Sequence, residues 1–67
     1  MPCLKVDITQ APVGTMIRYL EPHTAEVRIL AEDGNWWCPD RVYRGSTRYV
    51  QSRFTVGRAV LLRWGPE

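Results

Sequence analysis

Residues 14–20, GTMIRYL, and residues 25–31, AEVRILA, decide the fold class of this chain. In the second stretch apolar residues occupy every other position, and only Leu30 breaks the alternation. This period of two is typical of a strand with one buried face. The segment between the two stretches contains Pro22 and reads as a turn, and two strands joined by a short turn form a hairpin. We therefore expect antiparallel strands here, although residues 13–20 also fit one face of a helix.

Further strand and turn signals lie on both sides of this hairpin. Residues 4–9 alternate apolar and polar side chains, and residues 59–64 are strongly apolar, so both are predicted strands. A short strand is predicted at residues 36–38, ended by Pro39 or continued by residues 41–43. The other segments are turns at 21–24, 32–35 and 56–58, a loop at 44–47, and a short helix or strand at 48–54.

Taken together, these segments predict an all-β fold, a small five-stranded barrel of the OB-like or SH3-like kind. The 67 residues are enough for one domain with a small core. Closing a barrel removes the exposed edges that a small sheet would otherwise carry. The predicted core consists of Val6, Ile8, Ile17, Val27, Ile29, Val60 and Leu62.

Charge is distributed unevenly along the chain. Residues 1–39 carry three Lys or Arg and five Asp or Glu, a net charge of −2, whereas residues 40–67 carry six Arg and two acids, a net charge of +4. Such an asymmetry suggests a polyanionic partner for the second half. A solvated basic face without a ligand has the same composition, and both readings stay open.

Aromatic side chains lie among these arginines, and the combination is the main functional signal. Guanidinium groups pair with phosphates, and aromatic faces stack on unpaired bases. In a strand Trp36 and Trp37 point to opposite faces, and we expect Trp37 to be the exposed one, because Cys38 shares the side of Trp36 and is a frequent core residue. The candidate nucleic-acid-binding residues are Trp37, Arg41, Tyr43, Arg44, Arg48, Tyr49, Arg53 and Arg58.

A longer pattern supports the same ligand class. It includes Gly14-Thr15-Met16-Ile17, then Gly34, Gly45 and Arg48, and then RFTVGRAV at residues 53–60. Over about residues 13–64 this resembles the small S1-type barrels, in particular the family of bacterial translation initiation factor one. The resemblance implies an OB fold and RNA contacts from a basic segment, here Arg44, Gly45 and Arg48, with Arg53 nearby.

Two departures from that family's pattern matter. The family usually has Asp at the position of Arg58, and its last strand would fall beyond the end of this chain. We expect residues 4–9 to take the place of that strand. Otherwise the barrel is open, and its free edge invites a protein partner or a second copy of the chain in a homodimer.

Catalytic, metal-binding and membrane-spanning functions find little support in the sequence. His23 is the only histidine and lies in a predicted exposed turn, and Cys3 and Cys38 form no CxxC pair. A structural zinc site needs about four ligands. The longest aliphatic run, at residues 59–62, is too short to span a bilayer. We predict a non-enzymatic cytoplasmic protein with free thiols and no cofactor.

Two other functions remain as alternatives. Exposed aromatics and arginine are also typical of protein-binding hot spots, which suggests an SH3-like or Tudor-like interaction module, or a small phage or mobile-element inhibitor or adaptor. A winged-helix DNA-binding protein of the excisionase type would take residues 13–20 and 24–33 as helices and residues 36–51 as a wing.

Overall fold

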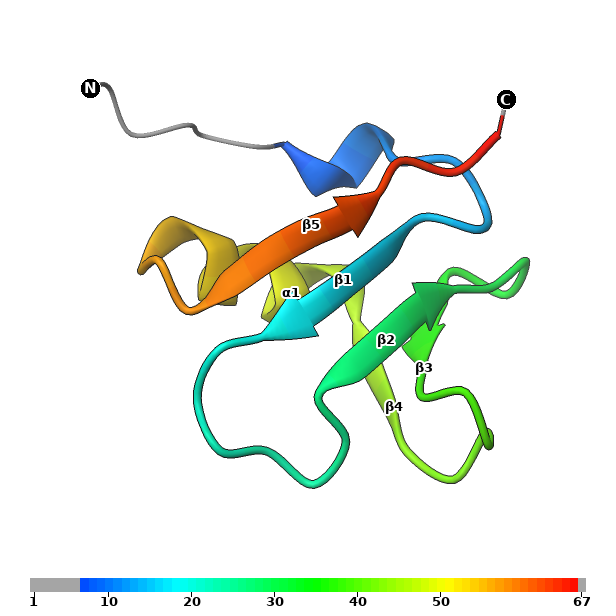
Figure 1. The fold of residues 1–67 in the computed structure, drawn as a ribbon. Coiled ribbons are helices and arrows are strands. Elements are labelled where there is room, and N and C mark those ends of the chain that lie inside the picture. The colour runs from blue at the N-terminus through cyan, green and yellow to red at the C-terminus, as the bar shows by residue number, and fades with distance from the viewer. Residues whose placement is uncertain (1–6, 67) are drawn as a thin grey trace.

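Five strands form one antiparallel sheet in the computed structural model, which describes residues 7–66 (Figure 1). The strands are β1 (Met16–Tyr19), β2 (Val27–Leu30), β3 (Asn35–Trp37), β4 (Arg44–Ser46) and β5 (Ala59–Arg63). Their order in the sheet is β4-β3-β2-β1-β5, so the first four follow one another and β5 returns to pair with β1. The β-rich fold class is confirmed, with four of the five strands where the sequence predicts them, but the sheet is open, with β4 and β5 at its two edges.

The central hairpin lies where the sequence predicts it. β1 and β2 pair antiparallel with Met16 opposite Ile29 and Arg18 opposite Val27. Residues 13–20 and 24–33 contain these strands and no helix among the described residues, so the secondary structure of the winged-helix alternative is wrong. The strand period of residues 25–31 therefore outweighs the helical reading of residues 13–20.

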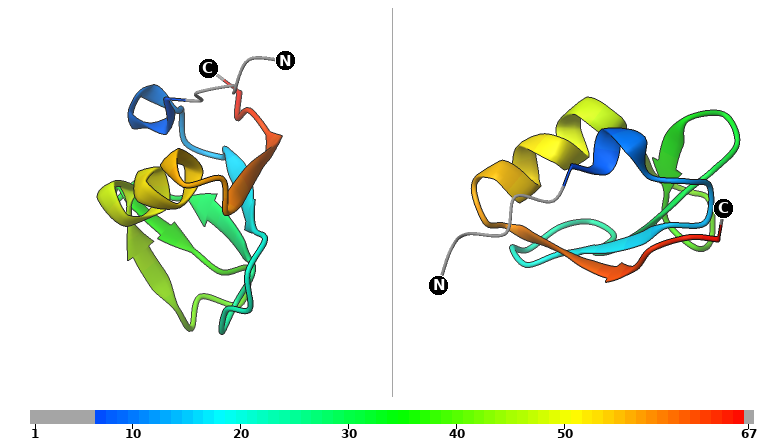
Figure 2. Two further views of the ribbon diagram at one scale, coloured as in Figure 1. Left: turned by 90° about the vertical axis from the view of Figure 1, so that its left-hand side faces the viewer. Right: turned by 90° about the horizontal axis from the view of Figure 1, so that it is seen from above.

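One face of the sheet, the inner face, is covered by two helical segments (Figure 2). These are the helix α1 (Thr47–Thr55) and the 3-10 turn η1 (Ile8–Gln10). The core between the two layers consists of Ile8, Ile17, Tyr19, Leu30, Trp36, Val50 and Ala59, all of them buried. The opposite face, the outer face, is covered by neither segment.

The predicted core is only partly right. Ile8 and Ile17 are buried, whereas Val60 and Leu62 are exposed, and Val6 lies outside the described residues. On β2 the buried positions are Arg28 and Leu30, so Val27 and Ile29 point to the outer face and are only half-buried. Because strand side chains alternate, the residue that breaks the apolar pattern, Leu30, marks the face that points inward.

The two segments just before α1 differ from the predicted secondary structure. Residues 44–47 were expected to form a loop, but Arg44–Ser46 is the edge strand β4, paired with β3 through Trp36 and Gly45. Residues 41–43 do not continue β3 and form the loop that turns the chain back. A strand of three polar or small residues carries no apolar alternation, so it cannot be recognised from period alone.

The predicted strand at residues 4–9 is wrong in its described part. Ile8–Gln10 is a 3-10 turn, capped by the Asp7 carboxylate, which accepts hydrogen bonds from the backbone N–H and the hydroxyl of Thr9. Ile8 packs into the core under α1, and its N–H donates to the Gln51 side chain at 2.9 Å. Leu4 and the other residues before Asp7 lie outside the described residues.

Local signals set the limits of α1. Ser46 is its N-cap, and the Ser46 hydroxyl accepts a hydrogen bond from the Tyr49 N–H at 3.1 Å. Beyond the last turn Gly57 has a φ of 76°, a conformation that favours glycine, and its N–H donates to the Phe54 carbonyl. Of the two readings left open for residues 48–54, the helix is therefore the right one.

The end of the described chain is fastened to the turn before β1. The Gly65 N–H donates to the Thr15 hydroxyl at 2.9 Å, and that hydroxyl donates to the Pro12 carbonyl at 2.8 Å. Both Thr15 and Gly65 are buried. This contact holds β5 against β1 at one end of the sheet.

Candidate nucleic-acid interface

The structure divides the eight candidate residues into two groups. Trp37, Arg41, Tyr43 and Arg44 lie on or beside the β3–β4 hairpin, whereas the remaining four, Arg48, Tyr49, Arg53 and Arg58, lie on α1 or in the turn that follows it. Within the first group, Arg41 and Arg44 lie beside Trp37 on the outer side of the sheet, and the second group is next to the helical layer.

Trp37 is the centre of the first group. Its neighbour Trp36 is completely buried, so Trp37 points to the outer face and is partly exposed, which agrees with the sequence prediction. The guanidinium carbon of Arg41 lies 5.7 Å from the Trp37 ring and that of Arg44 lies 5.9 Å from it. Two cations therefore share one indole, an arrangement stabilised by cation–π attraction.

The orientation of the indole is fixed by Asp33. The Trp37 Nε1–H donates to the Asp33 carboxylate at 3.0 Å, and the same carboxylate accepts the Asn35 N–H at 2.9 Å in the turn before β3. The hydrogen bond from the Asn35 backbone, followed by that from Trp37, holds the pKa of Asp33 below its ordinary value, and the charge of Arg41 acts in the same direction. Asp33 is therefore ionised at neutral pH and anchors the ring.

A buried thiol organises the loop that carries Arg41. Cys38 is 2% exposed, its thiol donates to Asp40, and its sulfur accepts the N–H groups of Val42 and Tyr43 at 3.3 and 3.2 Å. Within this loop Arg41 has a φ of 62°. A residue other than glycine in that region carries backbone strain, and such strain often accompanies functional loops.

An open cleft of about 700 Å³ runs beside Trp37. Its lining includes Val13, Ile29, Pro39 and Arg41, together with Glu32 and Asp33 of the acidic turn. The cleft thus combines apolar side chains with an aromatic ring and a guanidinium group. It is large enough for a flat ring such as a nucleobase.

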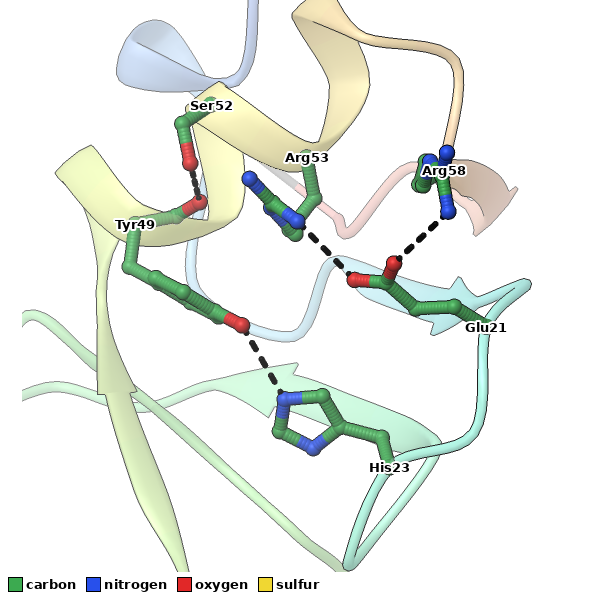
Figure 3. A network of polar contacts seen from close by, with 6 residues as sticks. All are labelled: Glu21, His23, Tyr49, Ser52, Arg53 and Arg58. Carbon is green, nitrogen blue, oxygen red and sulfur yellow. Dashed lines mark hydrogen bonds and ion pairs between the residues drawn. The ribbon is translucent and has the colours of Figure 1, made fainter.

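The second group is more strongly engaged within the protein (Figure 3). Arg53 pairs with Glu21 at 3.0 Å and Arg58 with the same carboxylate at 3.3 Å, and Arg53 also lies over the Tyr49 ring at 5.4 Å. Glu21 offsets part of their charge. Arg48 is exposed and belongs to none of the ion pairs between described residues.

Sequence reasoning missed a third cluster, on the inner face. His23 was expected to be exposed in a turn, but its ring stacks on the buried Tyr19 at 4.3 Å and contacts Arg28 and Tyr49. Arg28 is 3% exposed. The one available signal in the sequence was Arg28, a charged residue in a predicted strand whose neighbours Val27 and Ile29 are apolar.

Two other kinds of site are absent from the described part of the chain. No group of three or more His, Cys, Asp or Glu among residues 7–66 is placed to hold a metal ion. None of the described helices has the length and apolar character needed to cross a membrane. Comparison of the chain with protein-family models, with curated proteins and with solved structures finds no match.

Proposed function

We propose that this protein binds single-stranded nucleic acid, RNA in the first place, through the outer face of its β3–β4 hairpin. The observation that carries the proposal is the pair of guanidinium groups, from Arg41 and Arg44, over the Trp37 ring. Neither arginine belongs to the ion pairs between described residues, so both charges are free for phosphates. Aromatic rings beside arginines are how single strands are held without sequence preference.

In this proposal a base stacks at Trp37, within the open cleft, and the two arginines contact the phosphates on either side of it. Tyr43, which is 45% exposed, stands between the arginines in the chain and offers a second ring. Arg48 extends the positive charge along α1. Arg53 and Arg58 contribute less than the sequence suggested, because Glu21 already holds both of them.

The strand order bears on the finer description of the fold. An OB fold is a Greek-key barrel, in which a long connection returns the fourth strand to the first. Here four strands follow one another in space and the fifth returns to the first. That order supports an incompletely closed SH3-like barrel over an OB-like one, while the proposed ligand class rests on Trp37 and its arginines and not on the fold.

A protein partner is the second candidate function, and β5 is the observation that favours it. This edge strand leaves Val60 and Leu62 exposed, 38% and 48%, on a sheet whose edge is free to pair. The predicted homodimer would use the same edge. Binding of this kind would depend weakly on salt and would be lost in Leu62→Lys, whereas nucleic-acid binding would survive that change.

The test is fluorescence anisotropy of a labelled, mixed-sequence single-stranded RNA at several salt concentrations. Arg41→Gly removes the side chain and suits the positive φ, so the loop keeps its shape, and Arg44→Ala removes the second charge. We expect each variant to weaken binding and to lower the slope of log K against log salt by about 0.7, the value for one phosphate contact on a single strand.

A charge-matched control is Arg63→Ala, which removes one exposed arginine from β5, at the other edge of the sheet. It should leave the affinity close to that of the wild type. Equal losses in Arg41→Gly and Arg63→Ala, or binding that is insensitive to salt, would refute the proposal.

A further inference from the structure

The inner cluster contains a buried cation without an acid. Arg28 is 3% exposed and takes part in none of the ion pairs between described residues. Its guanidinium donates to the Ala25 carbonyl at 3.1 Å, to the Trp36 carbonyl at 3.5 Å and to the Nδ1 atom of His23 at 3.4 Å. A buried charge is costly unless it is paired, and neutral acceptors at these distances compensate it only in part.

Two donors without partners lie in the same cluster as Arg28. Among the described residues, the buried side-chain polar atoms that make no hydrogen bond are the Tyr19 hydroxyl and the Nε atom of Arg53. The guanidinium of Arg28 lies 5.3 Å from the Tyr19 ring, and the rings of Tyr19 and Tyr49 are 6.0 Å apart. Unpaired buried donors are rare in proteins, and two in one cluster point to a missing acceptor.

The charges of the cluster point to the kind of acceptor. Arg28, Arg53 and Arg58 bring three positive charges, and within residues 7–66 Glu21 is the one carboxylate in their ion pairs, with Arg53 and Arg58. Burial raises the pKa of Tyr19, so its hydroxyl is protonated at neutral pH and available as a donor. An oxyanion would supply both the negative charge and the acceptor oxygens that the cluster lacks.

His23 occupies the position from which such an anion would approach. Its Nδ1 atom accepts from Arg28, which requires the proton to be on Nε2, and Nε2 lies 3.2 Å from the Tyr49 hydroxyl (Figure 3). His23 is carried by the segment between β1 and β2, residues 20–26, which has no helix or strand. Both His23 and Tyr49 are partly exposed, so the ring is the layer between solvent and the buried arginine.

We propose that this cluster is a phosphate-binding site in which the His23 ring is a displaceable cover. When the ring moves out on its loop, a phosphate group takes its place beside Arg28 and accepts hydrogen bonds from the hydroxyls of Tyr19 and Tyr49. The site shares no residue with Trp37, Arg41 and Arg44 and lies on the inner face. A test of the phosphate site is therefore independent of a test of the RNA interface proposed above.

The first test is thermal unfolding in sodium phosphate and in sodium chloride at the same ionic strength. A ligand that binds only the native state raises its stability in proportion to ln(1 + [L]/Kd). We expect the unfolding temperature to rise with phosphate and not with chloride. Tyr19→Phe, which removes an unpaired hydroxyl and keeps the ring, should fold normally and lose most of that rise, whereas Tyr43→Phe, a matched exposed tyrosine, should keep it.

A second variant tests the role of the cover. His23→Ala opens the site, so its unfolding temperature should respond to lower phosphate concentrations than that of the wild type. Because His23 is the chain's one histidine, its ring resonances can be followed without assignment during a phosphate titration, and they should shift with the same Kd. Equal responses to phosphate and chloride, or a Tyr19→Phe response equal to that of the wild type, would overturn the proposal.

The source of the phosphate group is decided by further arms of the same assay. Inorganic phosphate, a nucleoside 5′-monophosphate and the matching nucleoside are compared at equal concentration. A response to both phosphates with similar Kd assigns the site to the free ion, and a tighter response to the nucleotide assigns it to a phosphate monoester. A response to the nucleoside as strong as that to the nucleotide would contradict phosphate recognition.

Discussion

Identical side chains do different things in this protein because their neighbours differ. Arg53 and Arg58 share the carboxylate of Glu21, Arg41 and Arg44 share the ring of Trp37, and Arg28 is buried among neutral acceptors. A count of arginines along the sequence cannot separate these three environments. The first fixes a loop to the helix, the second faces solvent, and the third lies inside the fold.

The first of these environments predicts a pH dependence of stability. The hydrogen bond from Arg53, assisted by Arg58, holds the pKa of Glu21 below its ordinary value. A carboxyl group with a lowered folded-state pKa stabilises the protein above its unfolded pKa, about 4.3, and the contribution is lost as pH falls through the folded value. Glu21→Gln should therefore lower the urea midpoint at neutral pH, and the difference from wild type should disappear in acid.

A suitable control is Glu26→Gln, because the ion pair of Glu26 with Arg18 is about half-exposed on both sides and is expected to contribute little. Urea denaturation of the three proteins at neutral and acid pH gives the comparison. A Glu21→Gln midpoint that equals that of Glu26→Gln at neutral pH would contradict the structural role of Glu21.

Among the elements, α1 depends most clearly on one side chain. The Ser46 hydroxyl caps the first turn through the Tyr49 N–H, while Ser46 itself is the last residue of β4. Ser46→Ala should destabilise the protein by roughly 1 kcal/mol, the usual effect of losing an N-cap. Ser52 lies on the exposed side of the same helix, and its hydroxyl donates to the Tyr49 carbonyl of the previous turn. Ser52→Ala should therefore stay within about 0.5 kcal/mol of wild type.

Chemical denaturation measures both changes. Two variants of equal stability would show that the hydroxyl of Ser46 does not cap the helix in solution. Loss of stability in Ser52→Ala alone would have the same meaning.

The elements that could be predicted from the sequence are those whose own residues show apolar alternation, an apolar run or typical turn residues. The β1–β2 hairpin, β3 and β5 carry apolar alternation or runs, and the turn around Asp33 carries its usual residues. β4 was missed because Arg44, Gly45 and Ser46 form a strand only through pairing with β3. That information belongs to the tertiary structure and is absent from local pattern.

The candidate site was predictable to a similar degree. Parity within the strand puts Trp36 and Trp37 on opposite faces, Cys38 on the side of Trp36 favours Trp37 as the exposed one, and the structure agrees. What the sequence could not provide was the backbone turn at Arg41, which returns its guanidinium to the Trp37 ring, and the inward direction of Arg28. Both depend on register and loop geometry, in which a shift of one residue reverses every side chain.

At the scale of the whole molecule, the acidic first half and the basic second half of the sequence do not form separate acidic and basic sides. β5 from the basic second half pairs with β1 from the first half, and β4 pairs with β3. The two strands of the second half therefore flank the three strands of the first half in one sheet. Positive charge gathers at two separate places, beside Trp37 and around Glu21, and only the first combines free arginines with an open cleft.

The contact at the end of β5 adds to the pairing of β5 with β1. A Cβ atom on Gly65 would lie 2.6 Å from the Thr15 nitrogen and the Val13 carbonyl oxygen, both of them backbone atoms. Gly65→Ala should therefore separate the end of β5 from the turn before β1 and destabilise the whole fold by roughly 1–3 kcal/mol.

Gly45→Ala is the matched control, since its added Cβ would meet its nearest atom, Arg28 Nη1, at 3.4 Å, an ordinary contact. Denaturation monitored both by tryptophan fluorescence and by far-UV circular dichroism measures the two variants. A Gly65→Ala protein as stable as Gly45→Ala would mean that this contact is absent in solution.

The buried thiol of Cys38 makes opening of the β3–β4 hairpin measurable. Its sulfur is closed off from solvent while it accepts the N–H groups of the loop that holds Arg41. An alkylating reagent can reach the sulfur only when the loop moves away from it, so the rate of modification at Cys38 reports how often the hairpin opens. Retardation of that rate by a bound oligonucleotide would report occupancy beside Trp37 without any label on either molecule.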